Sequence, residues 1–343
     1  MVSQFIPRVV FPTLDSLPRS YFLGHHKSGL SKMKTLLSSI DLIVECRDYR
    51  VPLTSRNPLF EASLAGRERL IVYTKRDLGS NQKKTDLQRE QIIRQWHAPS
   101  HVLFSDHKDR RDVRRVLQYP REYAANSMSL IGLRMMVVGM PNVGKSSLLN
   151  ALRSQGVGKG KAAFTGAQPG VTRKIATGVK IIEGTDESEG VYLVDTPGVF
   201  MPYVPDAEAM LKLALCGSVK DTIISPTMLA DYLLYRINLV SPDLYAEYHM
   251  PTNDIIPLLG AVAEKTGRLQ KGGVPDIDAS ALWIIQRWRT GHFGRFVLDE
   301  VTGGALERKK HEESTMVPSF HQAKKADKEA KRARSKRQNM ASG

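Results

Sequence analysis

Cysteine is scarce in this chain: only Cys46 and Cys216 occur among 343 residues. Two thiols cannot build a disulfide framework or a metal site, so the sequence indicates two reduced thiols. Long apolar runs are also missing, since none approaches the roughly 20 residues that a membrane-spanning helix needs. The chain therefore excludes a disulfide scaffold and a transmembrane segment, and its length allows about two domains with proper cores.

Acidic residues are outnumbered: 35 Asp and Glu stand against 50 Lys and Arg, which gives a formal net charge of +15. Such a surplus favours a polyanionic partner, because each phosphate that is neutralised releases condensed counterions. Nucleic acid or a ribonucleoprotein is the preferred interpretation. The alternative is a basic protein from a compartment in which basic proteins are common.

The N-terminal segment, residues 1–20, is almost free of acidic side chains: Asp15 is the only one, beside Arg8 and Arg19. This composition is typical of a mitochondrial transit peptide. Prolines interrupt any long amphipathic helix there, so an ordinary disordered N-terminus is the alternative. We assign the segment as a candidate transit peptide.

Short apolar runs rich in strand-forming residues alternate with helical patterns over residues 21–205. Strands that alternate with helices indicate an α/β fold with a doubly wound, mainly parallel sheet. The interval 156–172 is a polar, glycine-rich loop. The expected strands are 41–46, 69–73, 101–104, 133–138, 174–182 and 191–195, and the expected helices are 83–97, 109–118 and 145–154.

The pattern changes after residue 205, where strand signals become few. Helices are expected in the stretches DAEAMLKLALCG, SPTMLADYLLYRI, DIIPLLGAVAEKTG and DASALWIIQRWRTG, and Gly217, Gly267 and Gly291 fall where helices would end. We therefore expect a second, smaller all-α domain over 206–303. A basic tail, 304–343, is expected to be disordered or to become helical only on a partner.

The stretch Gly139-Met-Pro-Asn-Val-Gly-Lys-Ser matches the phosphate-loop pattern G-x-x-x-x-G-K-[ST], between an expected strand and an expected helix. Its glycines let backbone N–H groups wrap the phosphates. Lys145 places a positive charge on the outer phosphates, which makes it a candidate catalytic residue, and the Ser146 hydroxyl can ligate Mg²⁺. Nucleotide contacts are expected from Asn142, Val143, Gly144, Lys145, Ser146 and Ser147.

A second motif, VDTPG, ends another expected strand. Asp195 can hold Mg²⁺ through water, and Gly198 can offer its backbone N–H to the terminal phosphate. Thr172 lies in the loop between the two motifs, where a switch threonine closes on Mg²⁺ and the γ-phosphate; it is thus a candidate catalytic and metal residue. Each residue alone could belong to an ordinary turn, but their order after a phosphate loop predicts a nucleotide switch.

The base-reading pattern [NT]-K-x-D precedes the phosphate loop here. Thr74, Lys75 and Asp77 follow a strand; Asp77 would accept hydrogen bonds from the guanine ring N–H and amino group, and the Lys75 stem would cover the base. Ser105 ends the next strand, where a backbone contact to guanine O6 is expected. The nucleotide site is therefore circularly permuted, and a linker near 119–132 would join what are elsewhere the two termini.

This motif order, with RDYRVPLTSRNP at residues 47–58, resembles the circularly permuted ribosome-assembly GTPases of the YlqF/RbgA family over about residues 20–300. The resemblance implies an enzyme that binds and hydrolyses GTP with Mg²⁺ while it assists maturation of the large ribosomal subunit, with that subunit and its rRNA as partners. Together with the N-terminal composition it favours the mitochondrial matrix, with peripheral inner-membrane association. A nucleolar or cytoplasmic assembly GTPase is the alternative.

The chain departs from the family pattern at two places and shares one further feature with related GTPases. The family usually has Asn where this chain has Thr74, and the shorter hydroxyl is expected to reduce guanine affinity, although Asp77 still excludes adenine. Asn142 matches a residue that helps to hold K⁺ near the phosphates in related GTPases, which makes K⁺ a second expected cofactor. Near the N-terminus the family has Pro-Gly-His-Met, where this chain has Leu23-Gly-His-His.

Val199 follows the DTPG motif, at the place where signalling GTPases have a water-orienting Gln. Valine cannot orient water, so the catalytic group must come from elsewhere. The resemblance aligns His25 with a family histidine proposed to take part in hydrolysis. A group supplied by ribosomal RNA is the second hypothesis, and a surface histidine is the alternative role of His25.

The helical domain is the expected RNA platform. Trp283 and Trp288, at helical spacing, are more simply explained as core residues. The tail segment KRARSKRQ could be a nuclear signal, and a regulatory GTPase with a protein effector is the competing function. Basic and aromatic side chains are interleaved in one stretch: Arg287, Trp288, Arg289, His292, Phe293 and Arg295.

Overall fold

A computed structural model gives the fold. Residues 1–303 form one compact unit, and residues 304–343 form another. None of the helices among the described residues combines the length and the apolarity that a bilayer crossing requires. The structure describes residues 5–12, 30–31, 33–64, 66–126, 132–163, 165–166, 178–184, 190–199, 204 and 206–315.

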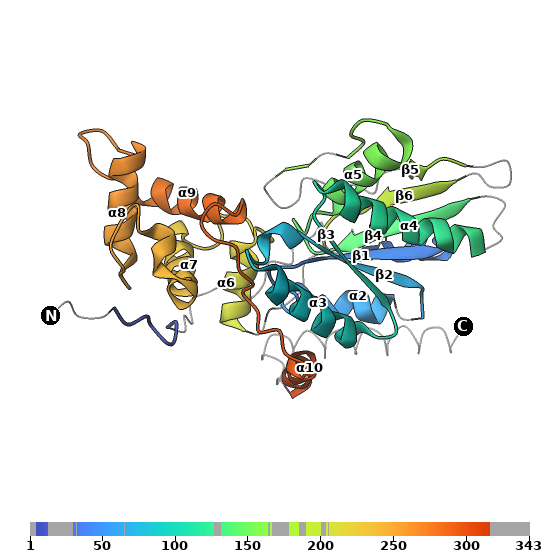
Figure 1. Cartoon of the computed structure of the whole chain (residues 1–343), viewed down its shortest axis with the longest axis horizontal. Coiled ribbons are helices and arrows are strands. Elements are labelled where there is room, and N and C mark those ends of the chain that lie inside the picture. The colour runs from blue at the N-terminus through green and yellow to red at the C-terminus, as the bar shows by residue number, and fades with distance from the viewer. Residues whose placement is uncertain are drawn as a thin grey trace, which may run out of the picture. The chain divides into compact units, whose positions relative to one another are not determined.

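Six described strands form one sheet in the first unit, in the spatial order β3-β2-β1-β4-β6-β5 (Figure 1). Neighbouring strands are parallel except β5 and β6, which are antiparallel. Each expected strand is confirmed, although residues 174–177 of the fifth lie outside the described part of the chain. The strands are β1 Leu42–Asp48, β2 Arg69–Thr74, β3 His101–Ser105, β4 Leu133–Gly139, β5 Val179–Ile182 and β6 Val191–Asp195.

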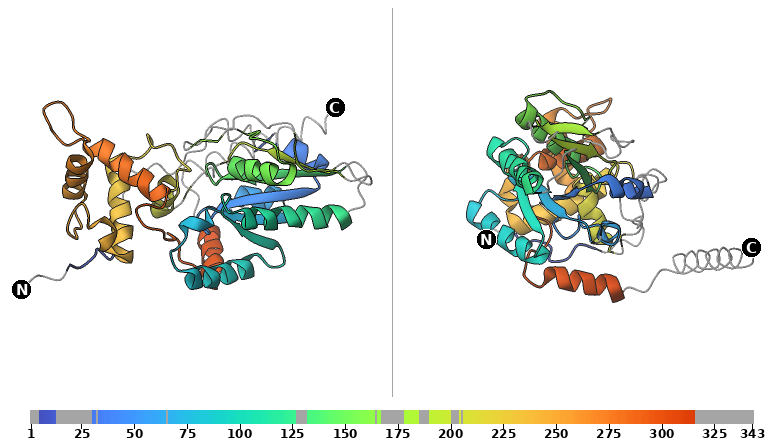
Figure 2. Two further views of the ribbon diagram at one scale, coloured as in Figure 1. Left: turned by 45° about the horizontal axis from the view of Figure 1, so that its top comes forward. Right: turned by 90° about the vertical axis from the view of Figure 1, so that its right-hand side faces the viewer.

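Helices cover both faces of the sheet, as the doubly wound prediction requires (Figures 1 and 2). Side chains alternate along β1, so Leu42 and Val44 face the core under α4 and α5, while Ile43 faces the opposite side. There α3 contributes Ile93, which packs among strand residues of β2 and β3. The elements around the sheet are η1 Leu37–Ser39, α2 Pro58–Ser63, η2 Arg76–Leu78, α3 Lys83–His97, α4 Arg110–Asn126 and α5 Lys145–Val157.

Helix α4 runs past its predicted end and into the predicted linker, 119–132. It continues to Asn126 with Pro120 inside it. Pro120 removes one backbone donor, but Tyr123 beyond it packs against the core, and this burial offsets the lost hydrogen bond. The connection between the two halves of the permuted site is therefore helical as far as Asn126, and residues 127–131 lie outside the described ranges.

The helices expected after residue 205 form, and three of them begin at an aspartate cap. The Asp206 carboxylate accepts hydrogen bonds from two backbone N–H groups of the first turn, and Asp254 and Asp276 each accept one from the first turn of a later helix. Gly267 ends α8 in the left-handed conformation, with φ 71°. The helices are α6 Ala207–Leu215, α7 Pro226–Val240, η3 Pro242–Tyr245, α8 Ile255–Thr266 and α9 Ile277–Arg289.

Buried contacts hold this helical domain to the loop that follows β1. The Asp299 carboxylate accepts hydrogen bonds from the Thr54 N–H at 2.8 Å and from its hydroxyl at 2.6 Å. The Leu298 N–H donates to the Arg50 carbonyl at 2.8 Å. The Arg50 guanidinium lies 4.8 Å from the centre of the Trp288 ring. The two domains recognised in the sequence therefore pack together within one unit.

Both cysteines are buried free thiols, as the sequence indicated. Burial raises the pKa of Cys46 to about 12 and that of Cys216 to about 12. The thiols are therefore protonated at neutral pH and are not nucleophiles.

Part of the candidate transit peptide lies along α7. Arg8 forms an ion pair with Asp231 at 2.6 Å. The Phe11 ring packs edge-on against Tyr232, with ring centroids 5.3 Å apart. Residues 5–12 thus contact the folded helical domain, whereas cleavage of the segment stays a prediction.

The second unit contains a helix in place of the expected disorder. Residues Ala305–Thr315 form α10. An ion pair of 2.9 Å joins Lys310 and Glu307 on its surface, at a spacing that supports helices. The rest of the tail, 316–343, lies outside the described residues.

Candidate functional site

The predicted site residues meet at the carboxyl ends of the parallel strands. The register places Ser105 beside Thr74 and Thr74 beside Asp48. On the other side of β1, β4 ends at Gly139 and β6 ends at Asp195. Segments far apart in the chain thus reach one edge of the sheet, which is where open α/β sheets bind their ligands.

The phosphate loop owes its shape to backbone conformations with positive φ. Asn142 has φ 56° and Gly144 has φ 91°, so successive N–H groups turn towards the same space and can form an anion-binding nest. Gly139 is required for a second reason: a Cβ atom there would lie 2.4 Å from the carbonyl oxygen of Cys46. The absence of a Cβ atom at Gly139 therefore lets the phosphate loop pack closely against the backbone of β1.

Lys145 lies inside the loop. Its ammonium group donates to the carbonyl oxygens of Met140 at 2.8 Å and Gly139 at 3.3 Å. Burial lowers the pKa of Lys145, and the nearby Asp195 opposes this shift. A Cβ atom on Gly198 would lie 2.5 Å from the Cα of Pro141 and 3.1 Å from the lysine Nζ. Only glycine allows the DTPG turn to approach the loop so closely.

The residues expected to hold Mg²⁺ fit an oxygen-ligated ion. Ser146 Oγ donates to Asp195 Oδ2 at 2.7 Å, so a hydroxyl and a carboxylate already face one another. Mg²⁺ prefers oxygen ligands and is often bound by one or two protein groups together with substrate phosphates. The described residues contain no cluster of three or more His, Cys, Asp or Glu side chains that could hold a metal. Thr172 lies outside the described residues.

A cavity of about 350 Å³ adjoins the first turn of α5. Ser147, His107 and Lys161 are among the residues that line it. Its lining brings residues of α5 together with His107, two residues after the end of β3. A nucleotide contact of Ser147 stays a prediction.

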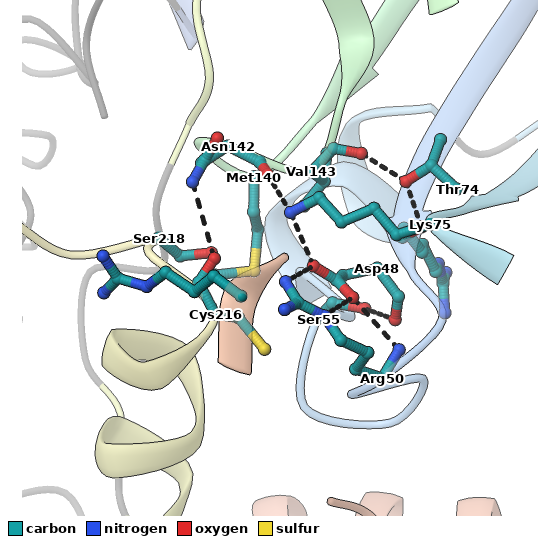
Figure 3. A network of polar contacts seen from close by, with 12 residues as sticks. Asp48, Arg50, Ser55, Thr74, Lys75, Met140, Asn142, Val143, Cys216 and Ser218 are labelled. Carbon is teal, nitrogen blue, oxygen red and sulfur yellow. Dashed lines mark hydrogen bonds and ion pairs between the residues drawn. The ribbon is translucent and has the colours of Figure 1, made fainter. Parts of the chain in front are cut away.

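Thr74 is tied directly to the phosphate loop (Figure 3). Its hydroxyl lies in hydrogen-bond contact with the carbonyl oxygens of Val143 and Arg47. The sequence analysis expected the shorter threonine side chain to reduce guanine affinity. In the structure the hydroxyl keeps a contact with the phosphate loop, and the reduced affinity stays a prediction.

Lys75 forms the second tie. Its backbone has φ 56°, and its ammonium group donates to the Asn142 carbonyl at 2.6 Å and to Asp48 at 2.9 Å. Lys75 and Asn142 are the only described non-glycine residues with positive φ. This costly conformation is thus found where the guanine half of the site meets the phosphate half.

Asp48 is a site residue that the sequence analysis missed. Its buried carboxylate accepts hydrogen bonds from the Arg50 guanidinium at 2.8 and 3.0 Å, besides the bond from Lys75 (Figure 3). Burial alone would raise the pKa of Asp48, but Arg50 and Lys75 hold it well below its usual range. The clue in the sequence was its position, since Asp48 ends β1 just as Thr74 ends β2.

Asp77 lies just after β2, and Ser105 is the last residue of β3. Asp77 lies in η2 and is half-buried; burial raises its pKa, and Asp106 adds to the shift. The Ser105 hydroxyl is buried and has no hydrogen-bond partner among the described residues. The predicted guanine contacts of both residues stay predictions.

Val199 is a core residue. It is 1% exposed and packs with Met136, Val138 and other apolar side chains. Its N–H donates to the Gly139 carbonyl at 3.2 Å, and its own carbonyl accepts from Asn57 at 3.0 Å. The residue after DTPG therefore cannot contact the attacking water. His25 lies outside the described residues.

The end of α6 touches the phosphate loop (Figure 3). The Asn142 side-chain amide donates to the Cys216 carbonyl at 3.5 Å, and the Ser218 hydroxyl donates to the Pro141 carbonyl at 3.0 Å. A Cβ atom on Gly217 would lie 2.6 Å from the Asn142 amide nitrogen. The helical domain therefore contacts the phosphate loop itself, and a K⁺ role for Asn142 stays a prediction.

The basic and aromatic stretch of α9 divides into buried and exposed members. Arg289 is a structural residue: it pairs with Asp221 at 2.7 Å and donates to two carbonyls at the end of α6. Trp288 and Phe293 are buried in the core. The core role expected for Trp288 is confirmed, and Arg289, which the sequence suggested for RNA contact, is engaged in a structural ion pair. His292 and Arg295 are exposed, and Arg287 is half-buried.

Known proteins with similar sequences cover most of this chain. A family model described as 50S ribosome-binding GTPase matches residues 134–238, which contain the phosphate loop and DTPG. Mitochondrial GTPase 1 of Schizosaccharomyces japonicus is 37% identical over 300 residues, covering 82% of this chain and 90% of the relative. Mitochondrial ribosome-associated GTPase 1 of Xenopus tropicalis is 37% identical over 299 residues, covering 81% of this chain and 94% of the relative.

Solved structures agree on the fold. GNP-bound YlqF from T. maritima matches with a TM-score of 0.55 at 22% identity, covering 79% of this chain and 97% of that chain. A GDP-bound YlqF structure matches with a TM-score of 0.53 at 23% identity, covering 78% of this chain and 98% of that chain. These matches confirm the α/β fold with a mainly parallel sheet followed by helices.

Proposed function

The chain belongs to the family of mitochondrial GTPase 1 and mitochondrial ribosome-associated GTPase 1, and from this membership we propose that it assists maturation of the large subunit of the mitochondrial ribosome. It is a GTPase, which converts GTP to GDP and phosphate. In this proposal the ribosomal particle activates hydrolysis. The location is mitochondrial, and we propose the matrix, with peripheral contact to the inner membrane.

The proposal rests on the contacts between the base-reading segment and the phosphate loop. Thr74 and Lys75 from the base-reading segment contact the carbonyl oxygens of Val143 and Asn142 in the phosphate loop. A bound guanine nucleotide would span this join, so the permuted halves act as one site. A module with a decayed nucleotide site would not need these ties.

The burial of Val199 supports the proposal that the ribosomal particle activates GTP hydrolysis. Since this residue cannot orient water, intrinsic hydrolysis is expected to be slow. His25 or a group of ribosomal RNA would position the water when the particle is bound. A His25→Ala enzyme that hydrolyses GTP at the normal rate on the ribosome would remove His25 from this role.

The contacts between α6 and the phosphate loop support a link between nucleotide state and the helical domain. The DTPG motif also leads into α6 through a short segment, 199–206. We propose that GTP holds the two domains in an arrangement that fits the immature subunit, and that hydrolysis weakens the fit. Identical small-angle scattering profiles with a GTP analogue and with GDP, on and off ribosomes, would contradict this.

The deciding experiment is GTP hydrolysis by the purified protein, alone and with mitochondrial large subunits, at physiological K⁺. Slow intrinsic turnover that rises strongly with subunits supports the proposal. Tight GTP binding with no response to subunits would favour a regulatory GTPase with a protein effector. Replacing K⁺ by Na⁺ in the same assay tests the proposed K⁺ role of Asn142.

A further inference from the structure

One cluster on the helical domain combines a fixed aromatic ring with two cations. The Arg268 guanidinium, in the loop after α8, lies 4.8 Å from the centre of the Trp283 ring. The Arg287 guanidinium, one helical turn along α9, lies 5.5 Å from the same ring. We call these three residues the Trp283 cluster. Both distances lie within the range of cation–π attraction.

The ring itself is held in place by two other aromatic residues. Tyr248 packs against Trp283 with centroids 5.8 Å apart and planes at 80°, and Phe293 packs against it at 6.3 Å and 82°. Tyr248 and Phe293 stack on one another at 5.8 Å. Phe293 is buried, so the group is anchored in the domain core. The two guanidinium groups therefore rest on a rigid base and lose little freedom when they bind a ligand.

Neither guanidinium forms an ion pair with a carboxylate of the described residues. The neighbouring cations differ in this respect: Arg289 pairs with Asp221 at 2.7 Å, and Lys265 pairs with Glu247 at 3.4 Å. The Arg287 Nε is buried and makes no hydrogen bond within the described chain. Two positive charges thus share one ring without a counter-charge, an arrangement that an anion would stabilise.

We propose that the Trp283 cluster binds backbone phosphates of RNA, an inference that rests on the proposed ribosomal function. A guanidinium that lies on a ring keeps its N–H donors at the edge, where two of them can bind one phosphate. The charge of +15 favours a polyanion over a single small anion. The ring faces carry the guanidinium groups, so Trp283 orients these donors in place of stacking on a base.

The cluster keeps Arg287 from the stretch that the sequence singled out and adds Arg268 and Trp283 to it. Trp288 is buried, and the Arg289 side chain is 8% exposed and paired with Asp221, whereas the half-buried Arg287 has no carboxylate partner among the described residues. Arg268 comes from a different helix connection and could not be grouped with them by sequence spacing. Only the packing of the α8–α9 connection onto α9 brings the cluster together.

The test is binding of a short fluorescent single-stranded RNA by the full chain, measured by anisotropy at several salt concentrations. The Arg268→Gln/Arg287→Gln variant is expected to bind about tenfold more weakly at low salt. Its plot of log affinity against log salt should be shallower by about 1.4, since each phosphate contact on a single strand contributes about 0.7. Lys83→Gln/Lys84→Gln, which removes two exposed charges from α3, is the matched control and should bind like the native protein.

A second variant tests the role of the ring. Trp283→Leu keeps both arginines but removes the base on which they lie, so it should lose part of the affinity with the salt slope almost unchanged. Intrinsic GTP turnover of all variants should match the native protein, and thermal unfolding should be lowered only in Trp283→Leu, which loses the contacts with Tyr248 and Phe293. A Trp283→Leu protein with native affinity would show that the ring does not orient the donors and would overturn that part of the proposal.

The outcomes separate this inference from the proposed function. Equal RNA affinity of the arginine variant and the control would overturn the cluster, while stimulation of hydrolysis by large subunits would still support the ribosomal role. Competition by poly-glutamate as effective as that by RNA would identify a site for acidic protein and would also overturn it. Native protein that binds RNA but shows no response to subunits would instead contradict the proposed function.

Discussion

Replacing Asp48 by Asn should weaken guanine nucleotide binding without changing the chemistry of hydrolysis. The substitution keeps the size of the side chain and one acceptor oxygen but removes the negative charge. Arg50 and Lys75 then lose their shared counter-charge, although both remain bonded to their surroundings. The Lys75 ammonium group ties the base-reading segment to the phosphate loop through the Asn142 carbonyl. In the variant it loses the Asp48 carboxylate, which lies 2.9 Å away and holds it in place.

The size of the effect follows from burial. The side chains of Asp48 and Arg50 are each 2% exposed, and that of Lys75 is 18% exposed. Breaking a buried ion pair by removing one partner typically costs about 3–5 kcal/mol, because an uncompensated charge is left behind. We expect a loss near the lower end, about 3 kcal/mol of unfolding free energy, since the amide still accepts one hydrogen bond. Nucleotide affinity should fall by roughly ten- to a hundredfold, or about 1.4–2.7 kcal/mol.

The measurement combines urea unfolding without nucleotide, equilibrium binding of fluorescent GDP and GTP, and turnover at saturating GTP. Glu45→Gln is the matched control, because Glu45 is also a buried carboxylate of β1 with two cation partners, Arg47 at 2.6 Å and Arg69 at 3.0 Å. It should lose similar stability yet keep native nucleotide affinity. Turnover at saturation should be unchanged in both variants.

The pH dependence has a defined sign. The folded-state pKa of Asp48 is depressed, so its stabilising effect is present above the unfolded value of about 3.9 and disappears as pH falls through the lower folded value. The native protein should therefore exceed Asp48→Asn in stability throughout the neutral range. If Asp48→Asn and Glu45→Gln lost nucleotide affinity equally, the positioning of Lys75 by Asp48 would be refuted.

Three further substitutions test other parts of the structure. Asp77→Asn should abolish GTP binding and permit xanthosine nucleotides, since an amide can donate to the xanthine carbonyl; competition binding with the two nucleotides checks this. The pKa of Asp77 is raised, so its carboxylate becomes protonated at a less acidic pH than an ordinary aspartate. The GTP affinity of the native protein should fall as this protonation occurs, and a titration of affinity against pH tests this. Val199→Gln should lower stability by about 2 kcal/mol, because it buries an amide in an apolar cluster, and a rise in intrinsic turnover would contradict the burial argument. Phe11→Ala should cost about 1–2 kcal/mol in thermal unfolding through lost contact with Tyr232, with nucleotide affinity unaffected.

Several expectations changed because they depended on packing. The sequence ended a helix before Pro120, yet Tyr123 and its neighbours carry α4 onward by burying against the core. The Thr74 hydroxyl contacts Val143 of the phosphate loop, a partner that the sequence did not predict. Arg289 was grouped with RNA-binding residues, although Asp221, far away in the sequence, pairs with it. In each case the deciding contact joins residues that are far apart in the sequence.

The sequence by itself determined the strands, the helical domain and the permuted order of the nucleotide motifs. These features are local: apolar periodicity selects strand or helix, and the glycines and the lysine of a phosphate loop act through the backbone of a few adjacent residues. Only the tertiary structure decided which side chains hold the site together. Asp48, Lys75 and Asn142 come from three segments, and the end of α6 reaches the loop at Asn142. Such partners are selected by how elements pack, because buried charges and donors must be satisfied by whatever residue the fold brings within reach.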